Sequence, residues 1–121
     1  MPRPSWDDYF FSLAAVAATR ASCPRASVGV ILVDPRTHRV VGTGYNGAPS
    51  GLPSCDEVGC DIVDNHCVRS VHGEANAIAA AARHGVNLEG KVAYITAPLD
   101  VCVRCANLMR STGIDWKIRI D

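Results

Sequence analysis

The sequence lacks two features that would point to large partners, namely an excess of one charge and a long hydrophobic run. Its 12 lysines and arginines balance its 12 aspartates and glutamates, so the formal net charge is +0. Domains that bind nucleic acid usually carry a basic stripe on their surface. The charge balance therefore argues against nucleic acid as a partner and favours a small-molecule ligand.

The apolar residues nowhere form a segment long enough to cross a bilayer. The stretch from Phe10 to Ala18 is far shorter than the roughly 20 residues of a transmembrane helix, and charged Asp7, Asp8 and Arg20 flank it. The first residues, Met1 to Trp6, contain two prolines and no apolar run, so no secretory signal is expected. We therefore expect a soluble, cytoplasmic protein with no membrane partner.

The chain also lacks repeats, low-complexity segments and linkers, and its length suits a single domain over residues 1–121. Apolar spacing and turn residues predict three helices, from Trp6 to near Cys23, over 73–84 and over 102–112, and four strands, over 28–33, 39–43, 91–96 and 116–120. The order is α-β-β-α-β-α-β. Two β-α-β crossovers at the end imply parallel strands with helices on the faces of an α/β sheet.

Two of the predicted helices have an apolar face. On the first, capped by Ser5, this face comprises Trp6, Phe10, Leu13, Ala14, Ala17 and Ala21. On the second, which Gly85 ends, it comprises Ala75, Ile78, Ala79 and Ala82. Residues 42–71 form a long irregular loop, which in a compact domain is usually functional or held in place by a ligand such as a metal ion.

Six cysteines in a cytoplasmic chain suggest metal binding, because disulfides are rare in that compartment. Three disulfides would be the alternative in a secreted protein. Two of the cysteines, Cys102 and Cys105, form a C-x-x-C pair at the start of a predicted helix. His72 and Glu74 lie at the start of another, so two helix amino termini, which stabilise thiolates, would point at one place.

One histidine and two cysteines would hold zinc with its fourth position open for water, as in catalytic sites. Glu74 would then be free to carry a proton from that water. The alternative for Cys102 and Cys105 is a purely structural or redox C-x-x-C pair. The combination with His72 and Glu74, in this order, favours a catalytic site.

With these residues the chain resembles the cytidine deaminase superfamily, and most closely the deoxycytidylate (dCMP) deaminases and their competence-associated bacterial relatives. The residues that carry the resemblance are Trp6-Asp7-Asp8-Tyr9-Phe10, Ser22-Cys23-Pro24-Arg25, Val28-Gly29, Gly44-Tyr45-Asn46-Gly47, His72-Gly73-Glu74-Ala75-Asn76-Ala77-Ile78, Tyr94-Ile95-Thr96 and the Cys102–Cys105 pair. The resemblance implies a three-layer α/β/α cytidine deaminase-like fold with a mixed sheet. It also implies the zinc-dependent conversion of dCMP to dUMP and ammonia, a homo-oligomer, and dCTP or dTTP as effectors.

The resemblance also implies roles for two further residues. Asn46 would hold the sugar hydroxyl, although Asn-Gly is also a favoured turn pair. Arg25 is a candidate for binding the phosphate, because arginine can bind phosphate with two parallel hydrogen bonds. The other interpretation of Arg25 is a solvated surface charge.

The chain departs from the family pattern at three places. Val101 stands where the family has a proline before the first cysteine, and Pro98 lies four residues before Cys102, which makes the loop at the pocket rim two residues longer. Gly73 replaces the usual alanine. The chain is also short at its carboxyl end, because it stops after the fourth strand, where the family usually adds a fifth strand and a final helix.

Four cysteines remain, Cys23, Cys55, Cys60 and Cys67, with His66 beside them as a possible substitute. Four thiolates make a closed, structural zinc site, and related deaminases often carry a second zinc in this loop. The alternative is free buried cysteines, which behave as small apolar residues.

Two other functions stay open. One is deamination of a different base, in a modified cytosine nucleotide, a nucleoside or a tRNA adenosine. The other is a non-catalytic, zinc-stabilised binding module, against which the retained Glu74 argues, because a structural site has no need of that carboxylate.

Overall fold

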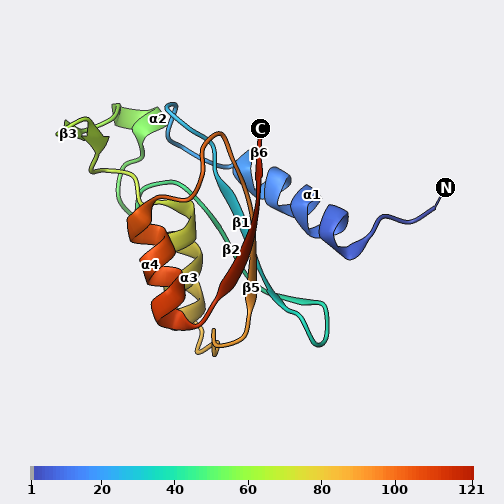
Figure 1. Cartoon of the computed structure of the whole chain (residues 1–121). Coiled ribbons are helices and arrows are strands. Elements are labelled where there is room, and N and C mark those ends of the chain that lie inside the picture. Colours follow the sequence, from blue (N-terminus) through green and yellow to red (C-terminus); the bar gives the residue numbers. More distant parts are fainter. Residues whose placement is uncertain (1) are drawn as a thin grey trace.

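The computed structural model describes residues 2–121, which form one mixed sheet with helices on both faces (Figure 1). The helices are α1 (Trp6–Ala18), α2 (Cys55–Val58), α3 (Gly73–Arg83) and α4 (Val103–Thr112). The strands are β1 (Gly29–Asp34), β2 (Arg39–Tyr45), β3 (Ile62–Val63), β4 (His66–Cys67), β5 (Val92–Ala97) and β6 (Asp115–Ile120). The predicted three-layer α/β/α fold is confirmed, and α2, β3 and β4 are added within the predicted loop.

The main sheet has the strand order β2-β1-β5-β6. β1 pairs antiparallel with both β2 and β5, whereas β5 and β6 are parallel. β2, β5 and β6 therefore run in one direction, as the two predicted crossovers require, and β1 lies between the first two of them. Because α3 follows β2 and α4 follows β5, both helices begin at the same edge of the sheet.

The central strand β1 is buried on both faces, which explains its uninterrupted apolar sequence. Its alternate side chains enter two separate cores. The core under α3 and α4 contains Val30, Leu32, Ala77, Ala81, Ile95 and Met109, and the core under α1 contains Phe10, Phe11, Ala14, Ile31, Val33 and Tyr94. None of the helices within residues 2–121 has the length and apolar character needed to cross a membrane.

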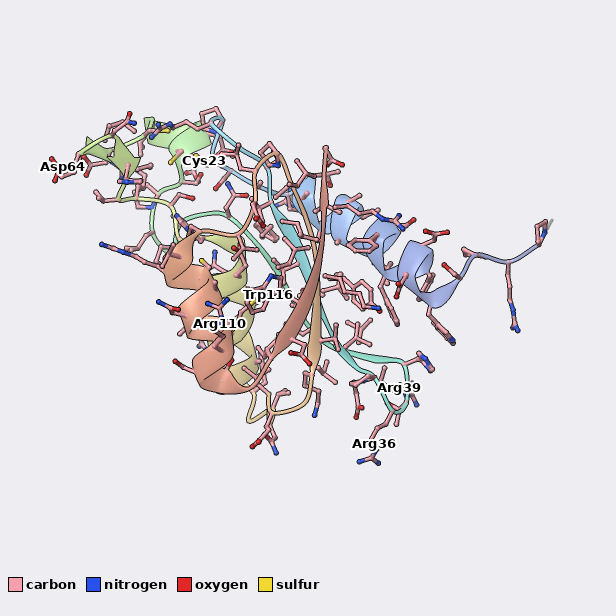
Figure 2. The ribbon with its side chains drawn as sticks, viewed as in Figure 1. Cys23, Arg36, Arg39, Asp64, Arg110 and Trp116 are labelled. Atoms are coloured by element: carbon pink, nitrogen blue, oxygen red, sulfur yellow. The ribbon has the colours of Figure 1, made fainter. Side chains whose placement is uncertain are left out.

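The edge strand β6 is fastened to helices on both of its faces. The Arg110 guanidinium of α4 lies 5.2 Å from the centre of the Trp116 ring, as Figure 2 illustrates. On the opposite face, Lys117 Nζ lies 3.1 Å from Asp7 Oδ1 of α1. A hydrogen bond from Tyr94 and the Lys117 ammonium hold the pKa of the Asp7 carboxyl below its usual value.

The first helix is shorter than predicted. Ser5 caps it as expected, since its Oγ accepts from the Asp8 amide at 3.1 Å, but the helix ends at Ala18 rather than near Cys23. The next three amides bond to carbonyls three residues back, which tightens the turn. Trp6 is 52% exposed and stacks on His38 instead of entering the core.

The predicted buried face of α3 is partly wrong: Ile78 packs against the core as predicted, but the most buried face is rotated by part of a turn. Ala77 and Ala81 are buried, whereas Ala79 and Ala82 are exposed. Glu74 precedes Ala77 by three residues, so the two lie on one face of the helix. A run of alanines carries almost no periodic signal, and here the inward face is the one that also carries Glu74.

The segment 42–71 is not uniformly irregular. It contains the short helix α2 and the hairpin β3-β4, whose turn residues Asp64 and Asn65 both have positive φ, 50° and 64°. Asp and Asn tolerate this conformation, and a two-residue hairpin turn of the I′ type requires it twice. The Asp-Asn pair was therefore a signal for a hairpin that apolar spacing did not reveal.

A glycine on β2 lets α3 approach the sheet closely. A Cβ added at Gly44 would lie 2.6 Å from both the Ala77 amide nitrogen and the Gly73 carbonyl oxygen, and neither backbone atom can move alone. At Gly42, two residues earlier, an added Cβ would meet only the Leu32 side chain, at 3.1 Å.

We expect Gly44→Ala to lower the free energy of unfolding by about 3 kcal/mol or more, because α3 must move off the sheet. Gly42→Ala is the matched control and should lose much less, since the end of the Leu32 side chain can rotate away. Urea denaturation of both variants measures the difference. Equal losses would show that the approach of α3 does not depend on this glycine.

Candidate metal centre and active site

The amino termini of α3 and α4 bring the three predicted metal donors together. His72 caps α3, Cys102 caps α4, and Cys105 lies in the first turn of α4. His72 Nδ1 is 3.3 Å from Cys105 Sγ and 3.5 Å from Cys102 Sγ. All three donor atoms lie within 4.8 Å of one another.

These separations fit tetrahedral zinc. With zinc–sulfur and zinc–nitrogen bonds of about 2.3 and 2.1 Å, tetrahedral angles place the nitrogen and a sulfur about 3.6 Å apart. Within the described part of the chain, no fourth side chain joins this group of donors. The set therefore suits a zinc site with one position open to the pocket above it.

Glu74 lies beside these donors, 7% exposed, at the first turn of α3. Burial, together with the charge of Glu74 and the neighbouring Cys102, raises the pKa of the Cys105 thiol. Negative charge is thus crowded into a buried place, which a divalent cation would relieve, because thiols that coordinate a metal are deprotonated.

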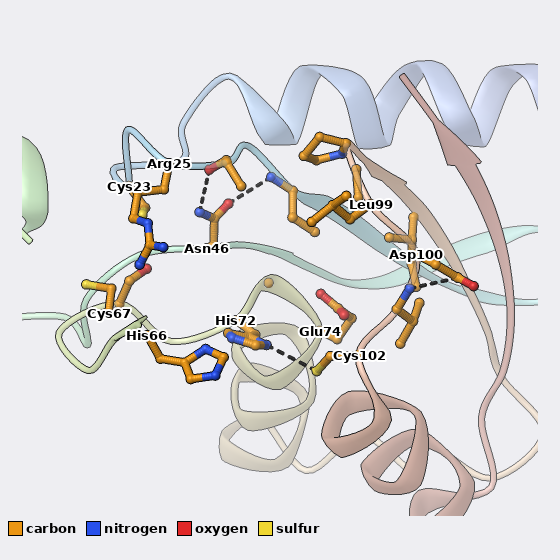
Figure 3. Close-up of a pocket in the computed structure, with 18 of the residues that line it drawn as sticks. Cys23, Arg25, Asn46, His66, Cys67, His72, Glu74, Leu99, Asp100 and Cys102 are labelled. Carbon is orange, nitrogen blue, oxygen red and sulfur yellow. Dashed lines mark hydrogen bonds between the residues drawn. The ribbon is translucent and has the colours of Figure 1, made fainter. Parts of the chain in front are cut away.

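A cavity of about 320 Å³ opens above His72, Glu74 and Cys102 (Figure 3). Leu99 borders it on one side, and Arg25 and His66 lie on the opposite side. The other apolar residues that line it are Ala26, Val28, Ile95, Ala97, Pro98, Val101 and Ile118. The side near Leu99 thus offers mainly apolar surface together with the Asp100 carboxylate, and the other side offers hydrogen-bond donors.

The predicted longer loop forms part of the apolar border. It runs from Pro98 to Val101, and Leu99 within it is 73% exposed. The Val101 amide donates to Asp100 Oδ1 at 2.7 Å. The departure from the family pattern therefore lies at the rim of the cavity and not among the metal donors.

Asn46 lines the cavity and also braces its wall. Its Oδ1 accepts from the Val28 amide and its Nδ2 donates to the Ala26 carbonyl, both at 2.8 Å (Figure 3). Neither Asn46 nor Gly47 is among the described residues with positive φ, so the pair does not form the tight hairpin turn that Asn-Gly favours. One N–H and one lone pair of the amide remain for a ligand.

Arg25 and His66 both line the cavity from exposed positions. Arg25 Nη2 donates to the Asn65 carbonyl at 3.3 Å, which leaves its other N–H groups available. His66, predicted as a possible metal ligand, is not in the cluster of cysteines and instead lies at the cavity wall (Figure 3).

The other four cysteines form a second cluster, which we call the four-cysteine cluster. The sulfurs of Cys23, Cys55 and Cys60 lie within 4.8 Å of one another, and Cys67 Sγ lies 3.5 Å from Cys55 Sγ. All six cysteines of the chain are free thiols. The cluster draws on the loop after α1, on α2 and the residues after it, and on β4. Its four thiols match the donor set of a closed zinc site, although Cys67 Sγ lies outside the group of three sulfurs that are all within 4.8 Å of one another.

The thiols of this cluster differ in acidity. Burial, Cys67 and Cys60 raise the pKa of Cys55 to about 12. Burial also acts to raise the pKa of Cys67, but hydrogen bonds from the backbone of Ser70, Asp61 and Arg69 outweigh it and lower the pKa to about 6. Backbone groups are thus already arranged to stabilise a thiolate at Cys67, while Cys55 needs a cation.

Asn76 supports the site although the sequence reasoning assigned it no role. Its Nδ2 lies 2.9 Å from the Tyr45 carbonyl, 3.2 Å from that of Gly47 and 3.3 Å from that of Val71. The side chain therefore ties α3 to the end of β2 and to the segment before His72. Its place two residues after Glu74 was the only signal, and spacing alone does not reveal a backbone clamp.

Comparison with known proteins agrees with this geometry. Residues 4–118 match the family model described as the cytidine and deoxycytidylate deaminase zinc-binding region. Over 126 aligned residues the chain is 38% identical to the deoxycytidylate deaminase of Mycobacterium phage D29. This alignment covers 95% of this chain and 94% of the relative. It is also 38% identical to ComE operon protein 2 of Bacillus subtilis, covering 94% of this chain but only 58% of that protein.

Solved structures share the fold. The dCMP deaminase of cyanophage S-TIM5, crystallised with dCMP and dUMP, superposes with a TM-score of 0.77 at 20% identity, covering 98% of this chain and 85% of that one. The cytidine deaminase of Mycobacterium leprae gives a TM-score of 0.63 at 21% identity, with 98% and 89% covered.

Proposed function

Because the chain belongs to the cytidine and deoxycytidylate deaminase family, we propose that it is a zinc-dependent hydrolase that converts dCMP to dUMP and ammonia. The observation that carries this proposal is the buried Glu74 carboxylate beside a three-donor site with an open position. A structural site needs neither feature. The phage deoxycytidylate deaminase aligns over nearly its whole length, which favours the nucleotide as substrate.

In this reaction the chain's own residues position the reactants and move a proton. Zinc held by His72, Cys102 and Cys105 would act as a Lewis acid that activates water. Glu74 would accept one proton from the attacking water and deliver it to the ring nitrogen, where it stays in the product, and would then transfer the second proton of that water to the amine, which departs as ammonia. Its burial keeps competing solvent away from the proton path.

The walls of the cavity match the parts of dCMP. We assign the base to the region around Glu74 and Leu99, where the lining is apolar. Asn46 would bond the sugar hydroxyl with the donor and lone pair that its backbone contacts leave free. Arg25 would bind the phosphate from the opposite side, because its guanidinium is exposed and carries unused donors.

The remaining elements of the proposal concern the second metal and the setting. The four-cysteine cluster would hold a structural zinc, and six free thiols suit the reducing cytoplasm. Ile120 is 58% exposed on the edge strand β6, which offers apolar surface to a second copy in a homo-oligomer. Regulation by dCTP or dTTP rests on the family resemblance alone.

We expect Glu74→Ala to lower the turnover of dCMP by about a hundredfold or more, because it removes the proton carrier. Its zinc content and circular dichroism spectrum should match those of the wild type, since Glu74 is not a metal donor. Glu89→Ala, at an exposed loop position, is the control and should keep full activity. Turnover that survives in Glu74→Ala would overturn the proposed proton path.

Ammonia release should single out dCMP among cytosine and adenine compounds. The panel contains dCMP, 5-methyl-dCMP, deoxycytidine, cytidine and a tRNA hairpin with a target adenosine. Faster deamination of another compound would identify a different substrate. No ammonia from any of them, with zinc bound, would instead favour the non-catalytic binding module.

Zinc analysis of the purified chain should find two ions per chain. Cys102→Ser should remove the ion of the open site, and Cys60→Ser that of the four-cysteine cluster, each without the loss of the other. Elemental analysis by mass spectrometry measures both. One ion per wild-type chain would show that the cluster is a group of free thiols.

A further inference from the structure

The four-cysteine cluster and the substrate cavity share a wall. Cys23 and Cys67 belong to the cluster and also line the cavity, whereas Cys55 and Cys60 do not line it. The two shared cysteines lie next to the cavity's exposed hydrogen-bond donors in the sequence. Arg25 follows Cys23 by two residues, and His66 directly precedes Cys67.

The segment that carries Arg25 is held at two points. At one end Cys23 is 8% exposed within the cluster. At the other end the Asn46 side chain binds the Ala26 carbonyl and the Val28 amide. Arg25 lies between these two anchors and is exposed, so its position depends on both of them.

The segment that carries His66 has little support of its own. Strands β3 and β4 contain two residues each, and Ile62 and Val63 are about half exposed, at 49% and 50%. A two-stranded hairpin of this size is not stable in water by itself. Its anchors on the cavity side are Cys67 in the cluster and the hydrogen bond from Arg25 to the Asn65 carbonyl at 3.3 Å, and four residues after Cys67 the chain is held again where Val71 pairs with Gly47.

We propose that the four-cysteine cluster positions the phosphate-binding side of the cavity, by fixing from one point the two segments that carry Arg25 and His66. This inference rests on the proposed function, since it assigns the phosphate of the nucleotide to that side. The cluster is then more than a staple for a long loop. It orders in advance two donors from remote parts of the chain, which lowers the entropy lost when an anion binds.

The loss of the cluster therefore weakens binding of the phosphate and leaves binding of the base and sugar intact. The apolar side of the cavity stands on the main sheet, through Ile95, Ala97 and Ile118, and does not depend on the cluster. Asn46 likewise follows β2 and keeps its place beside α3.

The test compares the reaction product dUMP with deoxyuridine, which lacks the phosphate. Cys60→Ser is the variant, because Cys60 belongs to the cluster and does not line the cavity. Calorimetric titration should show a loss of dUMP affinity of about tenfold or more, the size of one hydrogen bond to a charged group. Deoxyuridine affinity should not change, and the zinc of the His72 site should stay bound. Val58→Ala, an exposed position of α2 outside cluster and cavity, is the matched control and should bind both ligands normally.

A double-mutant cycle with Arg25→Gln identifies the route of the effect. If the cluster acts through Arg25, Cys60→Ser should cost much less dUMP affinity in the Arg25→Gln background than in the wild type. Losses in the Arg25→Gln and in a His66→Gln background that both equal the wild-type loss, or equal losses for dUMP and deoxyuridine, would overturn the proposal. If Cys60→Ser does not fold, Cys60→Asp keeps a weaker zinc ligand, and a smaller loss confined to dUMP is then expected.

This outcome is separable from that of the proposed function. A wild-type chain that deaminates no compound, yet binds dUMP better than deoxyuridine and loses that difference in Cys60→Ser, would refute the activity and support the positioning role. If the wild type deaminates dCMP and Cys60→Ser loses affinity for dUMP and deoxyuridine equally, the activity is supported and the positioning role is refuted.

Discussion

The shared direction of β2 and β5 is the constraint on which the site depends. Because the two strands are parallel, the helices that follow them, α3 and α4, begin at the same edge of the sheet. The residues that cap them, His72 and Cys102, are then neighbours although 30 positions separate them in the chain. The close approach of α3 to β2 over Gly44 sets the depth at which Glu74 lies. The metal donors and the carboxylate are thus placed by the topology of the sheet, although residues 46–71 separate β2 from His72.

A second constraint is electrostatic. The chain gathers thiols, and one carboxylate, in two partly buried places, where each negative charge opposes the next. Apart from Cys67, whose thiolate is stabilised by backbone groups, thiols in such places ionise readily only beside a cation. The site of His72, Cys102 and Cys105 leaves one coordination position for water, and Glu74 lies beside it. The four-cysteine cluster instead contains four thiols, as many as a tetrahedral zinc ion takes as ligands. The same element, zinc, would therefore serve chemistry in one place and order in the other.

The two sides of the cavity are built in different ways. The side near Leu99 rests on β5 and β6, which belong to the hydrophobic core of the sheet. The side near Arg25 and His66 consists of short segments with few buried residues. We propose that Cys23 and Cys67, which lie close to Arg25 and His66 in the sequence, hold these segments through the four-cysteine cluster in place of hydrophobic packing. Small units that cannot build a core of their own commonly depend on metals or cross-links. Under the proposed function, affinity for the base and affinity for the phosphate would then have separate structural origins.

The sequence by itself was enough to predict the α/β order and the meeting of His72, Cys102 and Cys105 near the buried Glu74, because these depend on local spacing and on the chemistry of the residue type. Local spacing failed where packing decides. The alanines of α3 do not indicate which face turns inward, and Asn76 shows its three backbone contacts only when β2 and α3 are brought together. The place of His66 at the cavity wall, away from the cluster, also followed from the hairpin turn at Asp64 and Asn65. Tertiary structure alone decided that the four-cysteine cluster and the cavity share a wall, since that contact joins segments some 40 residues apart, and no pattern within either segment records the other.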